Sequence, residues 1–282
     1  MRTPPSLGPI VCASLVLAAC ASLSVDEERT LGAELSREVK AEATFVRDRW
    51  VVDYVADIGQ EIVRVAGPQP FDYHFGVIEN DEINAFAMPA GYIYIHTETI
   101  LMARNVSELA GVIAHEVGHV AERHIAENYN RQRTASLGHQ ALVLGAGLAG
   151  GSAAAGAANL FGGLSAMAVL NSFGREAELE ADAFAVSTMP RAGYQPTGIV
   201  TFFHTLMAEG GPGAPSFLSS HPATEDRIAA TRALIAEQPQ MPGLKQDDGG
   251  RLEIIQQRIR LLTGRAGSQH RATEPRRSGE LR

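Results

Sequence analysis

The chain has 282 residues, of which 45% are hydrophobic and 20% charged, a balance that is ordinary for a globular protein with a buried core. Its 24 Lys and Arg residues against 32 Asp and Glu residues give a formal net charge of -8. Because the sequence has no basic block, electrostatic capture of nucleic acid is excluded as a starting hypothesis, and we expect no nucleic-acid partner.

Residues 1–19 have the pattern of a secretory signal, with Arg2 near the start and an apolar run over 10–19. The run is shorter than the roughly 20 residues that a helix needs to cross a bilayer, which favours a cleaved signal over a permanent anchor. The sequence Leu17-Ala18-Ala19-Cys20 resembles the lipobox of bacterial lipoproteins. We therefore expect lipid attachment at Cys20; the alternative is an ordinary cleavage site with a coincidental cysteine.

The residues after Cys20 bear on localisation. Ala21 and Ser22 follow it, and the lack of Asp there resembles lipoproteins that are sorted to the outer membrane. We expect a protein of the bacterial cell envelope that is anchored to the membrane through Cys20 and faces the periplasm. The other cysteine, Cys12, lies within the signal, so the mature chain would contain no disulfide and would depend on its core and on metal for stability.

The next part of the chain predicts two helices and then a small sheet. Over 26–65, apolar residues recur at spacings of three and four, which is typical of helices, and Gly67-Pro68 ends the second one. From 71 to 95 the pattern changes to short β-rich runs. The expected strands are 71–78, 83–87 and 92–95. Because Pro89 stops the second run, we expect it to be an edge strand.

Helices dominate the rest of the sequence. Asn105 and Glu108 have the spacing of a capping box and predict a helix that runs to about His124. Further helical patterns cover 175–189, 199–208 and 223–236. Residues 241–282 form a C-terminal extension, with an amphipathic stretch over 252–262 and then a polar tail that we expect to be disordered.

Residues 134–174 contain no Asp, Glu, Lys or Arg and are rich in Ala and Gly. One interpretation is a close-packed helical hairpin that breaks near Gly150-Gly151, and the other is an element that touches or crosses a membrane. Each Gly weakens a helix by about 1 kcal/mol relative to Ala, which disfavours a single spanning helix. We therefore favour the hairpin.

His115-Glu116-Val117-Gly118-His119 matches the pattern His-Glu-x-x-His within a predicted helix. Residues four apart lie one turn apart on the same face, so both imidazoles can reach one Zn²⁺ at about 2.0–2.1 Å. Glu116 would then stand beside the open position of the metal. The alternative is a pair of histidines on a partly buried helix that make ordinary hydrogen bonds.

A histidine is not the obvious third ligand. Metzincins place it ten residues after the first, where this chain has Ile125. His124 lies one place early, and we interpret it as a solvated surface residue.

A later predicted helix supplies carboxylates instead. Glu178 and Asp182 are four apart and share a face. Glu178 would complete a His2Glu site that leaves the fourth position to water, and Asp182 could accept the outward N–H of a ligand histidine. The alternative is an acidic, solvated helix face, on which Glu176 and Glu180 would be equivalent to Glu178.

Together these residues resemble the gluzincin family that contains the CAAX prenyl endopeptidase, HtpX and BepA, and most of all its small periplasmic lipoprotein members. The matching segments are Asn84-Ala85-Phe86-Ala87-Met88-Pro89 with Gly91-Tyr92-Ile93, His115 to His119, Arg175 with Glu178 to Asp182, and Ser220-His221-Pro222 with Arg227. The resemblance covers about residues 26–236. It implies an α+β, mainly helical, zincin-like metallopeptidase domain, which we place at 20–240, with an edge strand before the active-site helix.

The resemblance also implies roles for single residues. One Zn²⁺ per chain would be held by His115, His119 and Glu178, with Asp182 behind a ligand histidine. Zinc lowers the pKa of a bound water from 15.7 to about 7, and Glu116 would act as the general base.

The family likeness places the loop of His221 and Pro222 near the metal. There His221 would either donate to the oxyanion or serve as a fourth ligand that displaces water. A third reading, a loop histidine in a turn that Pro222 shapes, also stays open.

The edge strand suggests how a substrate binds. Unpaired backbone groups of Asn84, Ala85, Phe86 and Ala87 could hold an extended peptide beside the zinc. Such binding reads the backbone more than the side chains, so we expect unfolded or misassembled envelope proteins as substrates.

Two rival functions remain. A chaperone with a structural zinc would not need Glu116 and usually has four protein ligands. A di-iron bundle would need a second Glu-x-x-His motif, which the sequence lacks.

Overall fold

The computed structural model describes residues 23–147, 171–208 and 216–264, with the backbone alone over 136–147. The predicted signal, Cys20 and nearly all of the predicted disordered tail lie outside the described residues. Within them, helices dominate and one small sheet is present, which confirms the expected α+β, mainly helical class.

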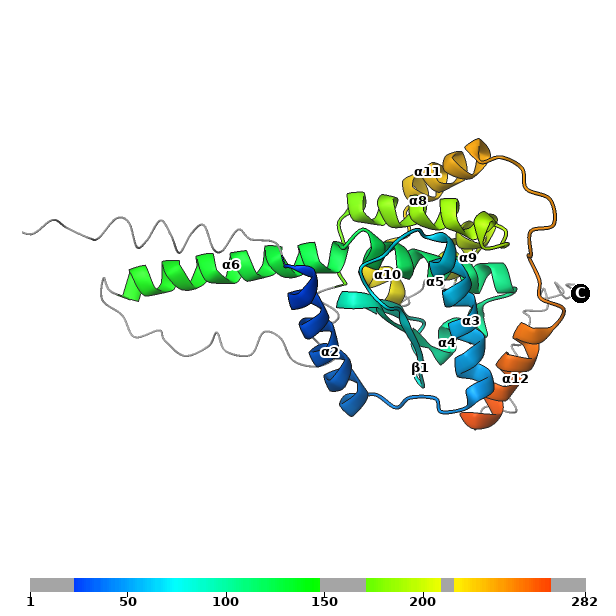
Figure 1. The fold of residues 1–282 in the computed structure, drawn as a ribbon, viewed down its shortest axis with the longest axis horizontal. Coiled ribbons are helices and arrows are strands. Elements are labelled where there is room, and N and C mark those ends of the chain that lie inside the picture. The colour runs from blue at the N-terminus through cyan, green and yellow to red at the C-terminus, as the bar shows by residue number, and fades with distance from the viewer. Residues whose placement is uncertain (1–22, 148–170, 209–215, 265–282) are drawn as a thin grey trace, which may run out of the picture.

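The predicted helices and strands are present in the predicted order, with boundary differences of a few residues, and two short helices that were not predicted are added at Thr97–Met102 and Ser216–Ser220 (Figure 1). The strands are β1 (His74–Ile78), β2 (Ala85–Met88) and β3 (Tyr92–His96), with a short 3-10 turn η1 (Pro89–Gly91) between the last two. The helices are α2 (Val25–Glu42), α3 (Arg49–Val65), α4 (Thr97–Met102), α5 (Val106–Ala121), α6 (His124–Gly147), α8 (Arg175–Arg191), α9 (Thr197–Ala208), α10 (Ser216–Ser220), α11 (Glu225–Glu237) and α12 (Arg251–Leu262).

The sheet has the order β1-β3-β2. β1 pairs with β3 in parallel and β2 pairs with β3 antiparallel, with Ala85 opposite Ile95. β2 is therefore an edge strand that precedes the helix of the His-Glu-x-x-His motif, as expected from the sequence. All four of its residues are buried, and α5 and α2 pack against the strand.

Helix α5 lies in the centre of the molecule, and every residue from Val106 to Val120 is buried. Its first turn is capped by Asn105, whose side chain accepts from the backbone N–H of Glu108. Gly111 lets α9 approach closely, since a Cβ there would lie 2.8 Å from the backbone of Ile199. Packing on several sides fixes the position of the metal-binding motif.

Helix α5 ends before the predicted limit of about His124. It stops at Ala121 because Arg123 takes a left-handed conformation, with φ 59°, which breaks the helix. Arg123 is held in this turn by Glu28 of α2, with a contact of 2.7 Å between Nη2 and Oε2. Helix α6 then begins at His124 in a new direction.

Helix α6 extends away from the body of the molecule (Figure 1). It contains the first part of the charge-free segment and continues to Gly147. The predicted break near 150–151 and the second arm of the hairpin lie outside the described residues. Among the helices that the structure describes, none is long and apolar enough to cross a membrane.

The amphipathic stretch after residue 250 returns to the same core. Leu252, Ile255 and Ile259 of α12 are buried in the central hydrophobic cluster. Gln256 donates from Nε2 to the carbonyl oxygens of Ile100 and Ala103, at 2.9 and 2.7 Å. Part of the C-terminal extension therefore packs against the helices that support α5.

Candidate metal centre

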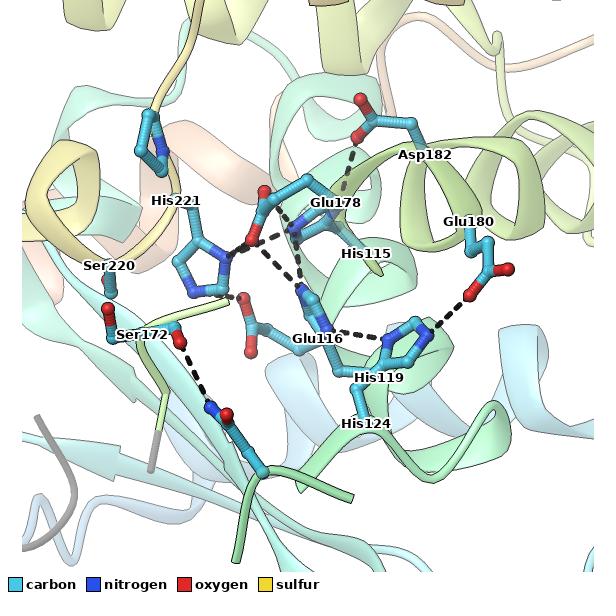
Figure 2. A network of polar contacts seen from close by, with 12 residues as sticks. His115, Glu116, His119, His124, Ser172, Glu178, Glu180, Asp182, Ser220 and His221 are labelled. Carbon is cyan, nitrogen blue, oxygen red and sulfur yellow. Dashed lines mark hydrogen bonds and ion pairs between the residues drawn. The ribbon is translucent and has the colours of Figure 1, made fainter. Parts of the chain in front are cut away.

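Three segments that are distant in the sequence bring their side chains together in the interior (Figure 2). Helix α5 supplies His115 and His119, and α8 supplies Glu178. His221 follows α10 directly. One ligand atom from each of these four buried residues lies within 4.8 Å of the others, so the group could hold one metal ion.

The spacing of the donor atoms fits zinc. Nε2 of His115 lies 3.1 Å from Nε2 of His119, and Nδ1 of His221 lies 2.9 Å from Oε1 of Glu178. Tetrahedral ligands at about 2.0–2.1 Å from a zinc ion lie roughly 3.3 Å from one another. A proton can bridge only two of these facing atoms, whereas one cation satisfies all of them. The residues present therefore fit the metal that the motif predicts.

The surroundings of His119 and Glu178 also favour the chemical forms that bind metal. Burial lowers the pKa of His119 well below its ordinary value, with help from His115 and His221 nearby, so the ring is neutral. Burial alone would raise the pKa of Glu178, but His221, His115 and His119 hold it below its ordinary value. A neutral imidazole and an ionised carboxylate are the forms that coordinate zinc.

The outer nitrogen of His115 contacts Asp182 at 3.0 Å, between Nδ1 and Oδ1. Asp182 is fully buried and accepts from Nε and Nη2 of Arg227 at 2.6 and 2.8 Å and from Oγ1 of Thr231 at 3.1 Å. Burial raises the pKa of Asp182, but the bonds from Arg227 and His115 outweigh it and lower the pKa below its ordinary value. The carboxylate stays charged and can hold the His115 ring in place.

Arg227 has a larger part in the site than sequence reasoning gave it. Its guanidinium is 3% exposed and also lies against Oε2 of Glu178. The spacing from Pro222 marked it as part of the family pattern, but no role followed from that spacing. A buried arginine that contacts both carboxylates balances their charge.

Glu116 is fully buried, and both of its carboxylate oxygens lack a hydrogen-bond partner among the described residues. Oε1 of Glu116 lies 3.5 Å from Nε2 of His221. Burial raises the pKa of Glu116 to about 7, against the opposing effect of His221. A carboxyl group in this state can both accept and release a proton near neutral pH.

His221 lies between Glu116 and Glu178, as the family resemblance implied for this loop. Its ring stacks on Phe217 with centroids 4.7 Å apart, and its backbone N–H donates to the Phe217 carbonyl at 2.8 Å. Nδ1 faces Glu178 while Nε2 faces Glu116. This position is compatible with both roles that the sequence left open, a fourth ligand and a donor to the oxyanion.

The prediction that His124 is a solvated surface residue is wrong. His124 is 4% exposed and not solvated, with Nδ1 3.0 Å from Nδ1 of His119 and Nε2 2.9 Å from Oε2 of Glu180. The prediction was wrong because it rested only on the spacing from His115, which does not register the turn before His124. The left-handed turn at Arg123 folds the first residue of α6 back toward His119.

The carboxylates of α8 are not equivalent. Glu178 is 2% exposed and Asp182 is fully buried, whereas Glu176 is exposed to solvent. The side chain of Glu180 is 55% exposed and pairs with His124. The alternative of a uniformly solvated acidic face is therefore wrong.

The predicted substrate strand lies next to the centre. Asn84 and Phe86 line a cavity of about 520 Å³ that also reaches Ser220, the neighbour of His221. The backbone N–H of Ala87 is near enough to Glu116 to lower its pKa. Phe86 itself is 5% exposed and Ala85 is fully buried, so these side chains belong to the core.

Comparison with known proteins agrees with this geometry. The model of peptidase family M48 matches residues 50–235. The beta-barrel assembly-enhancing protease of Escherichia coli is 33% identical over 215 residues, which are 75% of this chain and 44% of that protein. The metalloprotease LoiP of E. coli is 28% identical over 75% of this chain and 81% of its own.

A third relative comes from a eukaryote. The mitochondrial metalloendopeptidase OMA1 of Schizosaccharomyces pombe is 29% identical over 73% of this chain and 60% of its own length. The match to the E. coli beta-barrel assembly-enhancing protease covers 44% of that protein, so this chain spans less than half of its length. The resemblance drawn from the motifs is confirmed: the chain belongs to peptidase family M48.

Proposed function

We propose that this protein is a zinc-dependent endopeptidase that hydrolyses peptide bonds of unfolded or misassembled cell-envelope proteins. The observation that carries the proposal is a buried carboxylate, Glu116, whose oxygens have no side-chain hydrogen-bond partner among the described residues and which lies beside the donor cluster of His115, His119 and Glu178. A carboxylate is costly to bury without a partner, and a working site explains why this one is kept.

Each residue of the cluster has a separate role. His115, His119 and Glu178 hold the zinc, and Asp182 keeps the His115 ring oriented through its contact with Nδ1. Zinc supplies the acidity of a bound water and polarises the scissile carbonyl. Glu116 accepts the proton and passes it to the leaving amine, for which its raised pKa of about 7 is well suited.

His221 has two uses that follow from its two nitrogens. As a fourth zinc ligand through Nδ1, it would close the site and exclude water. With the Nδ1 contact released, it would donate to the oxyanion from the same loop. The contact of 2.9 Å between Nδ1 and Glu178 and the stacking on Phe217 support the closed arrangement in the structure described here.

Substrate would bind by strand addition along 84–87. β2 is the edge of the sheet, and the cavity lined by Asn84 and Phe86 runs beside it. An extended peptide that pairs with β2 would place a carbonyl near Glu116. A folded protein cannot offer such a segment, which is why we propose unfolded or misassembled substrates.

The place of action is the bacterial cell envelope. One bacterial relative is named for enhancing β-barrel assembly, and we extend a role in envelope protein quality control to this chain. Removal of residues 1–19 and lipid attachment at Cys20 would anchor it at the outer membrane, facing the periplasm. Mass spectrometry of the mature N-terminus tests the anchor: a chain that begins elsewhere, or an unmodified Cys20, would exclude it.

The activity is tested on the full chain, purified in detergent. We expect about one zinc per chain and cleavage of a reduced, unfolded model protein, but not of the same protein when folded. A chelator should abolish cleavage and added zinc should restore it. Tight zinc binding without any cleavage of unfolded substrates would favour a chaperone with a structural metal instead.

A further inference from the structure

We propose that His124 and Glu180 form a positioning relay that holds the metal ligand His119 in its metal-binding orientation. The inference rests on the proposed role of His119 as a ligand. The relay runs from Oε2 of Glu180 to Nε2 of His124 at 2.9 Å, and from Nδ1 of His124 to Nδ1 of His119 at 3.0 Å (Figure 2). Nε2 of His119 faces the donor cluster at the other end.

The protons in this relay of hydrogen bonds have one consistent arrangement. When His119 binds metal through Nε2, its remaining proton sits on Nδ1, which must donate. Nδ1 of His124 is the atom at hydrogen-bonding distance, so it accepts, and His124 carries its own proton on Nε2. That proton is donated to the carboxylate of Glu180. Every hydrogen bond then has one donor and one acceptor, and each fixes the tautomer of the next ring.

Packing holds the His119 and His124 rings in the orientation that the relay needs. Phe173 stacks on His119 with centroids 3.9 Å apart and planes 15° from parallel, and its centroid lies 6.2 Å from that of His124. His124 is 4% exposed at the start of α6. The turn before it is tied down by Arg123, which donates to the carbonyl of Leu23 and to buried Glu28. The His124 ring therefore has a defined position before any metal binds.

The two histidines of the motif are supported in different ways. His115 contacts Asp182, a buried carboxylate that accepts hydrogen bonds from Arg227 and Thr231. Among the described residues, no carboxylate contacts the outer nitrogen of His119, which reaches one through a second imidazole. The relay extends the support of His119 to the surface, where the Glu180 side chain is 55% exposed.

The test compares variants that keep or remove the acceptor on residue 124. His124→Phe keeps the ring shape without an acceptor, whereas His124→Asn places an amide oxygen close to the position of Nδ1. Support of a ligand histidine is typically worth 10- to 100-fold in metal affinity. We expect about that loss of zinc affinity in His124→Phe, measured by competition with a chromophoric chelator, and substantial recovery in His124→Asn.

The carboxylate is tested with a matched pair on α8. Glu180→Ala should weaken zinc binding in the same direction as His124→Phe but by less, because His124 remains as the acceptor for His119. Glu176→Ala removes an exposed carboxylate one turn away and should leave zinc affinity unchanged. The visible spectrum of the Co²⁺-substituted protein should change in His124→Phe and Glu180→Ala and not in Glu176→Ala.

The outcomes separate the relay from the proposed function and from simple packing. If the parent protein binds zinc and His124→Phe binds it equally well, the relay is wrong while the peptidase assignment stands. If His124→Asn loses as much affinity as His124→Phe, and the metal-free variants melt below the parent, His124 only fills space and the relay is again wrong. A parent that neither binds zinc nor cleaves unfolded protein would instead refute the proposed function.

Discussion

Helices α5 and α8 both carry side chains of the metal centre, but they differ in how they are buried. On α5 every residue from Val106 to Val120 is buried, whereas α8 buries one face and exposes the other. The buried positions of α8 include Glu178, Asp182, Ala185 and Met189, which recur at helical spacing. Helix α5 lies inside the core, and α8 packs against it with a buried face that includes two carboxylates, Glu178 and Asp182.

The difference decides which observation identifies the functional residues. On α5 burial does not discriminate, because apolar neighbours are as buried as His115, and the residue types in the motif carry the information. On α8 the residue type does not discriminate, because several carboxylates lie within two turns, and burial alone separates Glu178 from Glu176. A metal site built from two such helices needs both kinds of evidence.

The largest effect on zinc affinity should come from replacing Glu178, the buried glutamate of α8. Glu178→Gln removes the charge of the carboxylate at the donor cluster, so zinc affinity should fall by more than the 10- to 100-fold that is typical of residues behind a ligand. Glu176→Gln, two residues away and exposed, should bind zinc as the parent does. Competition with a chelator measures both. Equal affinities would mean that the inner face of α8 does not bind the metal.

These helices also show which features of the site can be predicted from the sequence. The His-Glu-x-x-His motif was readable because its chemistry depends on a local spacing of four on a helix. The choice of Glu178 over Glu176 needed the family resemblance, since it depends on which face of α8 meets α5. The same holds for Arg227, whose contacts join α8 to α11.

The prediction for His124 was wrong because a turn changes the direction of the chain just before it. His124 was interpreted as a solvated surface residue because it lies one place before the third-ligand position of metzincins. The left-handed conformation of Arg123 instead turns His124 toward His119, and a non-glycine residue gives no sequence signal for such a turn. The fold itself was more accessible, since the longer helices follow from apolar periodicity and the edge strand β2 from Pro89, while the short helices α4 and α10 were not predicted.

The complete burial of α5 predicts a strong penalty for added volume. A Cβ at Gly111 would lie 2.8 Å from the backbone of Ile199, so Gly111→Val should reduce the free energy of unfolding by about 1–3 kcal/mol. Gly174, just before α8, has open space around it, and Gly174→Val should cost less than about 1 kcal/mol. Chemical denaturation compares the two. Similar losses would show that α5 is less tightly packed than described.

The smallest effect concerns the first turns of the two helices. Asn105 caps α5 through its side chain, and Asn105→Ala should cost about 1 kcal/mol. Gly174 begins α8 without a side-chain cap, so Gly174→Asn should add a few tenths of a kcal/mol. Thermal melting with and without chelator measures both changes. A neutral Asn105→Ala would mean that packing alone holds the start of α5.

The central claim is that Glu116 activates water at a zinc held by other residues, and Glu116→Gln tests it most directly. The amide has the same shape and cannot accept the proton, while His115, His119 and Glu178 stay in place. We predict normal zinc content and normal melting with cleavage of an unfolded protein reduced by about 10²- to 10⁴-fold. Normal zinc with undiminished cleavage would contradict the account, because another group would then have to activate the water.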